Sequence, residues 1–488
     1  MVEPANLIVF QSDNHARRML GCYGHPVVRT PVLDRIAARG TRFARAYSPS
    51  PLCCPARAAI ATGRFPHETG YWDNALVYDG RVPSWMHRLR EQGHEVVSVG
   101  KLHFRSAEDD NGFSEEIAPM HIVGGVGGLV MVLRWSGEEP VRHGQWEMYV
   151  EQSGIGETAY QRYDREISER AIAWLRRHAT PGAKPWVLYV SYVSPHPPFL
   201  VPQRLWELYP LDRMPLPVQF RSGERPDHPA LEHVRRIMGF RAMDDEAALR
   251  RVAAGYAALV THLDEQIGSV LAQAEHLGLL ERTRVMYLSD HGEAAGAHGL
   301  FGKYTLHDTA AGVPLLMMGP GIAAGHVSHQ LVSLVDLFPT ILDNAGAAPA
   351  AADASLPGVS LWPALTGNAD LERPVFVEYH AAASKSASFM LREGSWKLIY
   401  HVGMPSQLFD LDTDPDEITD LAGTDPDRVA AMTARLRRIV EPEAVDARAK
   451  ADQRRRAEEC GGTGSILERG AFVYTPPPGT PAELRSAT

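Results

Sequence analysis

The chain has 488 residues, of which 44% are hydrophobic and 22% are charged, a composition that suits one large folded domain and a smaller one. Its formal net charge is -10 and its sequence has no basic stripe, which argues against a nucleic-acid partner; we interpret Arg454–Arg456 as a solvated helix face. No stretch is long and apolar enough to span a membrane, so we expect no membrane partner.

The cysteines and the first residues indicate a compartment. The chain has four cysteines, and two of them are adjacent, which does not resemble a disulfide framework. Met1–Pro4 lead almost directly into an apolar run, without the charged and apolar segments of a cleavable leader. We therefore expect a cytoplasmic location.

Several short apolar runs have the character of strands that are buried on both faces of a sheet. In chain order they are Asn6–Ser12, Val96–Val99, Trp186–Val193 and Val285–Ser289. Polar residues follow each run, namely Asp13 and Asn14, Lys101 and His103, His196, and Asp290 and His291. Because ligands of open α/β sheets bind beyond the carboxyl ends of the strands, we expect these polar residues to converge on one site.

Helical runs alternate with these strands, for example Tyr163–Arg177 and Ala247–His276. The alternation predicts an α/β fold for residues 1–370, with a large, mostly parallel sheet sandwiched by helices. Between about residues 105 and 160 the sequence is irregular, and Gly124–Gly128 lacks the strand-turn-helix context of a nucleotide-binding motif. We expect a mobile loop near the substrate there.

A second group of short segments, broken by turn residues, follows residue 370. The segments are Val375–Tyr379, Ser388–Arg392, Lys397–His401 and Gln407–Asp410, with a helix over Asp427–Val440. They predict a smaller C-terminal subdomain, residues 371–445, with an antiparallel sheet. We expect the tail, residues 446–488, to lie at a subunit contact of a homo-oligomer.

Adjacent cysteines precede a predicted helix N-terminus. Pro55 suits the first helical position, and an alanine-rich segment continues from it to Gly63. Free amides at such a terminus bind tetrahedral oxyanions, and Arg57 would add a fork of donors to the same group. The sequence thus indicates a sulfate or phosphate site at Cys53. In the alternative interpretation, Cys53 and Cys54 are small buried hydrophobes, Pro55 starts a helix and Arg57 is a surface charge.

This segment resembles the signature of the type I, formylglycine-dependent sulfatases of the alkaline phosphatase superfamily. That signature is Cys-x-Pro-Ser-Arg, three further residues, an apolar residue, Thr and Gly, and it is matched here by Cys53, Pro55, Arg57, Thr62 and Gly63. Ala56 replaces the usual Ser, as in choline sulfatases and phosphonate monoester hydrolases. The resemblance implies an alkaline phosphatase-like fold. It also implies that a formylglycine-generating enzyme converts Cys53, and not Cys54, to formylglycine.

The resemblance also implies a metal site. Asp13, Asp290 and His291 offer two hard oxygens and an imidazole, a set that suits one divalent cation. Modified Cys53 belongs to the same set, and Asn14 is a candidate ligand, since the family usually has consecutive carboxylates here. Most sulfatases carry Asn at the position of His291, and an imidazole shifts the preference toward Mn²⁺ without excluding Ca²⁺. For a lone Asp at a strand end, a helix cap is the alternative.

Further family motifs supply the remaining candidate catalytic residues: Lys101, His103, His196 and Lys303. The resemblance implies that Lys303 and His196 lie on the leaving-group side, and that His103 deprotonates the second hydroxyl of hydrated formylglycine. Two lysines and Arg57 around one tetrahedral group would stabilise its charge. Other histidines match less clearly, and we expect structural roles for His15, His25, His298 and His307.

Three functions fit these residues. The resemblance implies first a sulfatase that hydrolyses a sulfate monoester of a small alcohol or phenol to the alcohol and inorganic sulfate. The second is a phosphonate monoester hydrolase or phosphodiesterase that uses the same site, and Ala56, His291 and Pro195–Phe199 favour it. A sulfatase that also hydrolyses phosphonate monoesters and phosphate diesters would combine the first two functions. The third is a binding protein that retains the fold and the metal but leaves Cys53 as a thiol.

Overall fold

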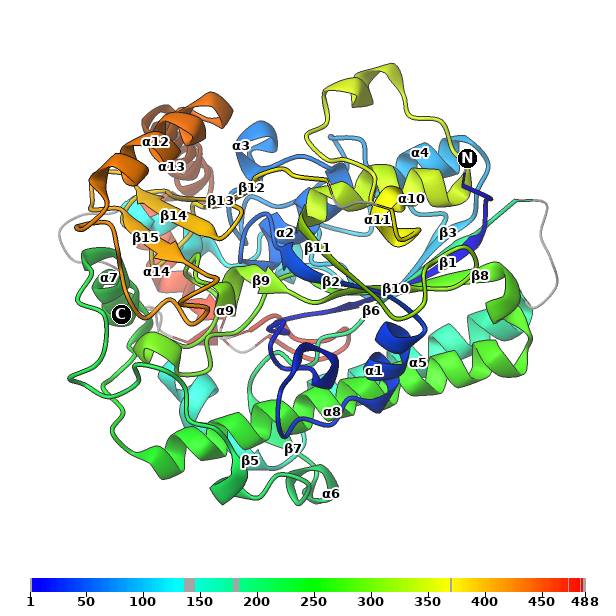
Figure 1. The fold of residues 1–488 in the computed structure, drawn as a ribbon, viewed down its shortest axis with the longest axis horizontal. Helices are drawn as coiled ribbons and strands as arrows, with labels where there is room; N and C mark the ends of the chain where they lie inside the picture. Colours follow the sequence, from blue (N-terminus) through cyan, green and yellow to red (C-terminus); the bar gives the residue numbers. More distant parts are fainter. Residues whose placement is uncertain are drawn as a thin grey trace.

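A large sheet flanked by helices organises the chain, of which the computed structural model describes residues 2–135, 145–178, 184–368, 371–472, 474–482 and 484–485. Within these residues the sheet has nine strands in the order β11-β2-β10-β8-β1-β6-β3-β4, and β9 pairs with β2 (Figure 1). The strands are β1 (Asn6–Ser12), β2 (Gly40–Tyr47), β3 (Val96–Lys101), β4 (Glu115–Met120), β6 (Val187–Ser191), β8 (Thr283–Ser289), β9 (Gly312–Val313), β10 (Leu315–Met318) and β11 (His326–Ser333).

The centre of the sheet is parallel. Strand β1 pairs in parallel with β6 on one side and with β8 on the other, and β3 continues the parallel arrangement beyond β6. Strand β10 is antiparallel to both of its neighbours, β2 and β8. The predicted α/β fold with a mostly parallel sheet is therefore confirmed.

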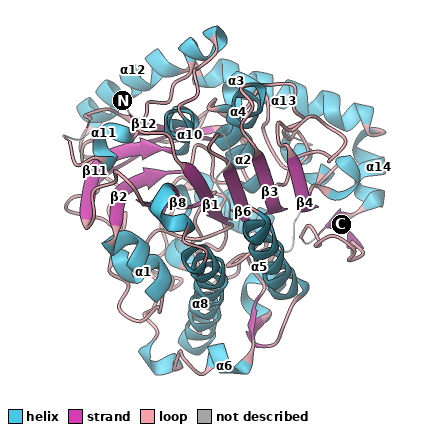
Figure 2. Cartoon of the chain, turned by 90° about the vertical axis from the view of Figure 1, so that its right-hand side faces the viewer, coloured by secondary structure: helices cyan, strands magenta, loops and turns pink. Residues whose placement is uncertain are grey.

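Helices cover both faces of this sheet, which explains why its strands are apolar throughout. Figure 2 shows α1 (Pro31–Ala38), α5 (Ala159–Arg177) and α8 (Glu246–His276) on one side, where they pack with Ile8 and Phe10 of β1. The opposite side carries α2 (Cys53–Thr62), α4 (Trp85–Glu91) and α10 (Leu337–Ala345), which pack with Leu7 and Val9. Alternate residues of β1 thus belong to different cores.

Shorter elements complete the α/β part. Its other helices are α3 (Pro66–Thr69), α6 (Gln203–Trp206), α7 (Pro229–Met238), α9 (Asp308–Ala311) and α11 (Trp362–Leu365). The segment predicted to be irregular contains β4, the 3-10 turns Val123–Gly125 and Leu129–Trp135, a π-helical turn (Glu147–Glu151) and β5 (Ser153–Ile155), which pairs with β7 (Phe199–Val201). It therefore contains more regular structure than we expected, although residues 136–144 of it lie outside the described residues.

A second, antiparallel sheet forms the C-terminal part, as predicted. It has four strands in sequence order: β12 (Val375–Tyr379), β13 (Ser388–Glu393), β14 (Trp396–His401) and β15 (Gln407–Asp410). Helix α12 (Pro426–Ile439) packs on it through Met432 and Leu436. The predicted boundary at residue 370 lies outside the described residues.

The tail returns to the α/β part of its own chain. Helices α13 (Pro442–Glu459) and α14 (Gly462–Arg469) pack beside the turn Leu129–Trp135, and Asp452 of α13 accepts a hydrogen bond from Trp72 at 2.9 Å. A short pair of strands, β16 (Ala471–Phe472) and β17 (Leu484–Arg485), follows. A subunit contact of this tail remains a prediction. Within the described residues, no helix is both long and apolar enough to cross a membrane.

Candidate active site

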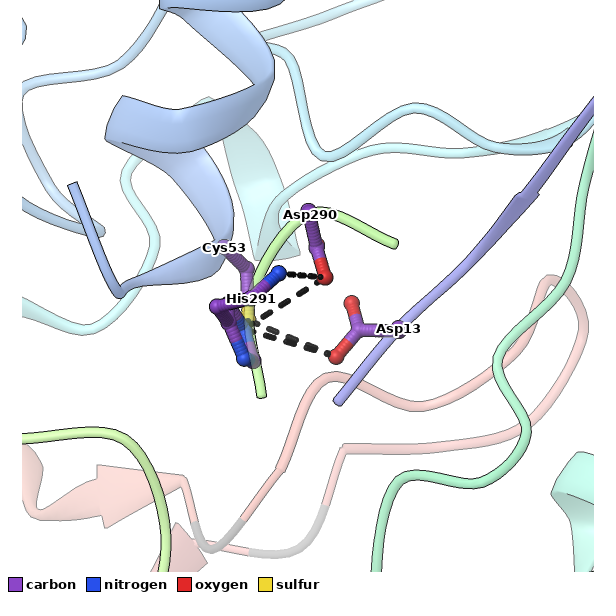
Figure 3. A group of neighbouring side chains, drawn as sticks. All are labelled: Asp13, Cys53, Asp290 and His291. Atoms are coloured by element: carbon purple, nitrogen blue, oxygen red, sulfur yellow. Dashed lines mark hydrogen bonds and ion pairs between the residues drawn. The ribbon is translucent and has the colours of Figure 1, made fainter. Parts of the chain in front are cut away.

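The polar residues that follow the central strands meet at one edge of the sheet. Asp13 follows β1, Lys101 ends β3, Asp290 and His291 follow β8, and Cys53 is the first residue of α2. Figure 3 shows the side chains of Asp13, Cys53, Asp290 and His291 gathered at one point. The ligand atoms of Asp13, Cys53, Asp290 and His291 all lie within 4.8 Å of one another, and all four residues are buried. The parallel strands explain this convergence, because their carboxyl ends share an edge.

Helix α2 places the two cysteines in different environments. It begins at Cys53, and Gly63 closes it with φ 66°, where an added Cβ would lie 2.9 Å from Phe338. The Sγ atom of Cys53 lies 3.2 Å from His291 Nε2 and 3.1 Å from Lys303 Nζ. Cys54 instead belongs to a separate small apolar cluster with Val77 and Ile122. Only the first cysteine faces the polar cluster.

In this structure Arg57 binds protein groups, and its predicted role as a clamp on the substrate anion stays a prediction. Its Nε donates to Asp290 at 2.8 Å and its Nη2 to Asp13 at 3.2 Å. Its Nη1 donates to the Lys101 carbonyl and to the Ser191 hydroxyl. The guanidinium therefore ties together two carboxylates and the ends of two strands. Burial alone would lower the pKa of Arg57, but the two carboxylates raise it, so the side chain stays charged.

The residues around Cys53 fit a divalent cation. His291 Nδ1 lies 3.0 Å from the Gly292 carbonyl, a contact in which Nδ1–H donates, so the lone pair is on Nε2, the nitrogen that faces Cys53 Sγ. Asn14 donates from Nδ2 to Glu293, and its buried Oδ1 has no hydrogen-bond partner among the described residues. A buried oxygen without a donor is costly unless something positive approaches it. Two carboxylates, an imidazole and this amide oxygen together form a suitable donor set.

The lysines set the charge of this cluster. Burial would raise the pKa of Asp13, but Lys101, whose Nζ lies 2.6 Å from the carboxylate, and then Lys303 hold it well below its usual value. Burial and the nearby Asp13 raise the pKa of Asp290 to about 6. Burial lowers the pKa of His291 to about 4, so its ring is neutral and able to bind a metal.

Two more histidines lie at the same site. His196 Nδ1 lies 2.7 Å from the Pro197 carbonyl, and His103 Nε2 lies 2.9 Å from the Thr475 hydroxyl. Burial lowers the pKa of both rings, and positive Lys303 and Lys101 respectively lower it further. Both rings are therefore neutral, the form in which an imidazole accepts a proton.

A cleft of about 730 Å³, its open mouth included, lies over Cys53. His103, His196 and Lys303 line it, together with Gly127 and Gly128 from the loop expected near the substrate. Its other walls are largely apolar and aromatic: Leu52, Ile122, Val130, Met131, Met148, Tyr149, Tyr304, Phe472 and Tyr474, with Asn74, Gln145 and Thr475.

Comparison with known proteins places the chain in a family. Residues 5–347 match the family model described as Sulfatase, and residues 296–443 match the model of the C-terminal part of N-sulphoglucosamine sulphohydrolase. The chain belongs to the sulfatase family. Its central sheet and C-terminal antiparallel sheet are those of an alkaline phosphatase-like sulfatase fold.

Individual relatives of this sulfatase cover most of the chain. It is 32% identical over 433 residues to the choline-sulfatase of Rhizobium meliloti (strain 1021), and this alignment covers 86% of this chain and 82% of that protein. It is 30% identical over 460 residues to Arylsulfatase K of Bos taurus, and this alignment covers 89% of this chain and 81% of that protein. The solved phosphonate monoester hydrolase of Agrobacterium radiobacter has a TM-score of 0.71 at 22% identity, over 91% of this chain and 96% of that one.

The sequence did not reveal three residues that support the site of this sulfatase. Glu293 accepts a hydrogen bond from the side-chain amide of Asn14. Asp164 accepts hydrogen bonds from the backbone amides of Val193 and Ser194, just before His196. Thr475 contacts His103. Glu293 follows the Asp290–Gly292 motif directly, so its place in the sequence was the one available signal. Asp164 and Thr475 stand in no recognisable motif.

The histidines expected to be structural lie outside this cleft. His15 contacts the Tyr287 hydroxyl and the Met19 carbonyl, and His25 Nδ1 accepts from the amides of Val27 and Val28. His298 contacts Gln219, and His307 lies beside it with the ring centroids 4.8 Å apart. The hydrogen bonds of His15 and His25 support the structural interpretation, whereas both ring nitrogens of His307 are buried without a hydrogen-bond partner among the described residues, so its role stays a prediction.

Proposed function

We propose that this sulfatase is a formylglycine-dependent sulfuric ester hydrolase that converts a sulfate monoester of a small alcohol or phenol to the alcohol and inorganic sulfate. The position of Cys53 carries the proposal. Its Sγ lies at the start of a helix, beside the two carboxylates and the imidazole, and 3.1 Å from the ammonium of Lys303. A nucleophile at that point would have cationic groups around the anion that it attacks.

The proposed cofactor is one divalent cation, Ca²⁺ or Mn²⁺, bound by Asp13, Asn14, Asp290, His291 and the modified residue 53. When bound, such an ion polarises an ester oxygen and favours the ionised form of a nearby hydroxyl. Carboxylate and amide oxygens suit Ca²⁺, and the imidazole of His291 shifts the preference toward Mn²⁺. Arg57 contributes by fixing the two carboxylates.

Formylglycine explains why a cysteine stands at this position. Its hydrated aldehyde carries two hydroxyls, so one oxygen can bond to the sulfur while the other later releases its proton and restores the aldehyde; a thiol has no second group for that step. In this assignment Lys303 and His196 stabilise the oxygen of the departing alcohol. His103 Nδ1, which is buried and has no hydrogen-bond partner among the described residues, takes the proton of the second hydroxyl.

A phosphonate monoester hydrolase or phosphodiesterase activity is the second candidate. Ala56 beside Pro55 and the imidazole of His291 in the metal set favour it, since both features resemble that class. The same cationic surroundings would suit a phosphonate or phosphate diester, because its tetrahedral centre also carries negative oxygens.

Parallel turnover assays test the proposal. The protein is produced with a formylglycine-generating enzyme, the proposed maturation partner, and kcat/KM is measured for nitrophenyl sulfate, nitrophenyl phenylphosphonate and bis-nitrophenyl phosphate. We expect the sulfate to be the best substrate, Cys53→Ala to be inactive and Cys54→Ala to remain active. A preference for the phosphonate would favour the second candidate. Metal-loaded protein that is unmodified at residue 53 and hydrolyses none of the esters would favour a binding protein.

A further inference from the structure

We propose that the C-terminal tail completes the active site, with Thr475 as a positioning residue that fixes the ring of His103. This inference rests on the proposed function for the role of His103 as a base. The contact joins residues that are 372 positions apart in the sequence, since Thr475 Oγ1 lies 2.9 Å from His103 Nε2. Both residues line the cleft over Cys53.

His103 depends on this partner. Its side chain makes the contact with Thr475 through Nε2, while Nδ1 is buried without a hydrogen-bond partner among the described residues. The residue is only 5% exposed, so bulk water cannot orient the ring in place of the hydroxyl. Its backbone is fixed separately, because the amide donates to the Met120 carbonyl at 2.8 Å. The rotation of the ring is therefore set at Thr475.

The tail is itself held in place beside the catalytic groups. The Tyr160 hydroxyl of α5 donates to the Thr475 carbonyl at 2.8 Å. The Tyr160 ring packs edge-on against Tyr474, with centroids 5.2 Å apart, and against His196, with centroids 5.7 Å apart. Upstream, Gln453 of α13 donates hydrogen bonds to Asp73 in the α/β part and to the carbonyl of His380, which follows β12. The tail is therefore attached to both parts of the chain. One tyrosine thus links the tail to the leaving-group histidine.

The contact suits either ring tautomer, and the proposed role of His103 as a base, together with a buried Nδ1 that has no acceptor beside it among the described residues, selects the tautomer with hydrogen on Nε2. When Nε2–H donates to the Thr475 hydroxyl, Nδ1 keeps its lone pair and is the nitrogen that accepts a proton. After that transfer both nitrogens carry hydrogen, and the same hydroxyl still accepts from Nε2, so no rearrangement is needed. Loss of the hydroxyl leaves Nε2–H without an acceptor, which removes the stabilisation of this tautomer and lets the ring rotate.

Substitution at Thr475 tests the inference. Thr475→Val keeps the shape and removes the hydroxyl, and we expect kcat for nitrophenyl sulfate to fall by about 10- to 100-fold, in the range found for supporting partners of active-site groups, with KM unchanged. Thr475→Ser should restore most of kcat. Thr480→Val, at an exposed position of the same tail, is the matched control and should behave as wild type.

A double substitution separates positioning from packing. In a His103→Ala background, Thr475→Val should cost nothing further, because the hydroxyl then has no ring to fix. An unchanged kcat in Thr475→Val, a change in KM alone, failure of Thr475→Ser to restore turnover, or an equal loss in the His103→Ala background would each overturn the inference.

A spectroscopic measurement keeps the inference testable even if the protein hydrolyses no sulfate ester. In protein with isotope-labelled histidine, nitrogen NMR should report His103 with the proton on Nε2, assigned by its loss in His103→Gln. In Thr475→Val we expect the His103 resonances to shift toward a mixture of tautomers, while Thr480→Val leaves them unchanged. A His103 tautomer that is the same in wild type and Thr475→Val contradicts the inference, whereas a silent wild type with the expected shift contradicts only the proposed function.

Discussion

Lys303 Nζ lies 3.1 Å from Cys53 Sγ, and both side chains are buried. Burial alone would lower the pKa of Lys303, whereas Cys53 and Asp13 raise it, so the amine remains an ammonium. A buried positive charge is costly unless it is paired, and Asp13, whose carboxylate lies 3.8 Å from Lys303 Nζ, is such a partner. The ammonium is thereby held beside Cys53, where we expect an anionic substrate to bind.

The leaving group should reveal what Lys303 and His196 do. We expect Lys303→Ala and His196→Ala to lower kcat/KM by about 10² or more for sulfate esters of weakly acidic alcohols, and far less for nitrophenyl sulfate, whose oxygen carries charge unaided. Arg57→Ala should slow both kinds of ester alike, because Arg57 holds Asp13 and Asp290 rather than the alcohol. The measurement is kcat/KM across alcohols of graded pKa. Mutants at Lys303 and His196 with the wild-type slope would refute these roles.

Glu293 should control metal binding through Asn14. Its carboxylate can only accept from the Asn14 amide, whereas Glu293→Gln offers a donor and favours a turned amide that presents NH₂ to the cation. We expect metal affinity to fall by about 10- to 100-fold, as for other residues behind metal ligands. Titration of Mn²⁺ into metal-free protein measures it. Asn14→Ala should show a similar loss, and the double variant should lose little more; unchanged affinity in Glu293→Gln would show that Asn14 Oδ1 is not a ligand.

Asp164 should make stability depend on pH. Burial raises its pKa to about 6, whereas an unfolded chain has an Asp pKa of about 3.9. The folded protein thus binds this proton more tightly, so the contribution of Asp164 to stability is fully present below about pH 4 and is lost as the pH rises to about 6. Relative to Asp164→Asn, the wild-type free energy of unfolding should fall by up to about 3 kcal/mol over this range and then level off. Urea unfolding at several pH values checks the difference, and a difference that rises with pH would contradict it.

Lys397 should be required for the junction between the two sheets. Its buried Nζ lies 2.9 Å from Asp308 and 2.7 Å from Glu417. Lys397→Met leaves these carboxylates short of a positive partner, and we expect a loss of about 3–5 kcal/mol in the free energy of unfolding. The control is Lys385→Met, at an exposed position. Equal stability of the two variants in urea unfolding would contradict the assignment.

The fold was predictable where local signals agree. Strands β1 (Asn6–Ser12) and β12 (Val375–Tyr379) have the bounds that the sequence predicts, because each is an apolar run ended by polar or small residues. Helix α2 begins two residues before Pro55, since the first amides of a helix need no partner within it and proline is tolerated throughout the first turn. Sequence alone did not fix that start.

The partners of the site residues were less predictable. The motifs named Arg57 and His103 but did not show that Arg57 holds Asp13 and Asp290, or that His103 meets Thr475. Such contacts join distant parts of the chain, and no periodicity or local spacing records them. They follow only from the way in which the strands and the tail pack.

The dependence of turnover on modification of Cys53 tests the central claim most directly. Preparations with different fractions of formylglycine at residue 53, determined by peptide mass spectrometry, are assayed with nitrophenyl sulfate at saturating Mn²⁺ or Ca²⁺. We predict that kcat per mole of protein rises in proportion to the fraction modified at Cys53 and extrapolates to zero for the unmodified thiol. Turnover that is independent of this fraction, or that follows oxidation of Cys54, would contradict the account.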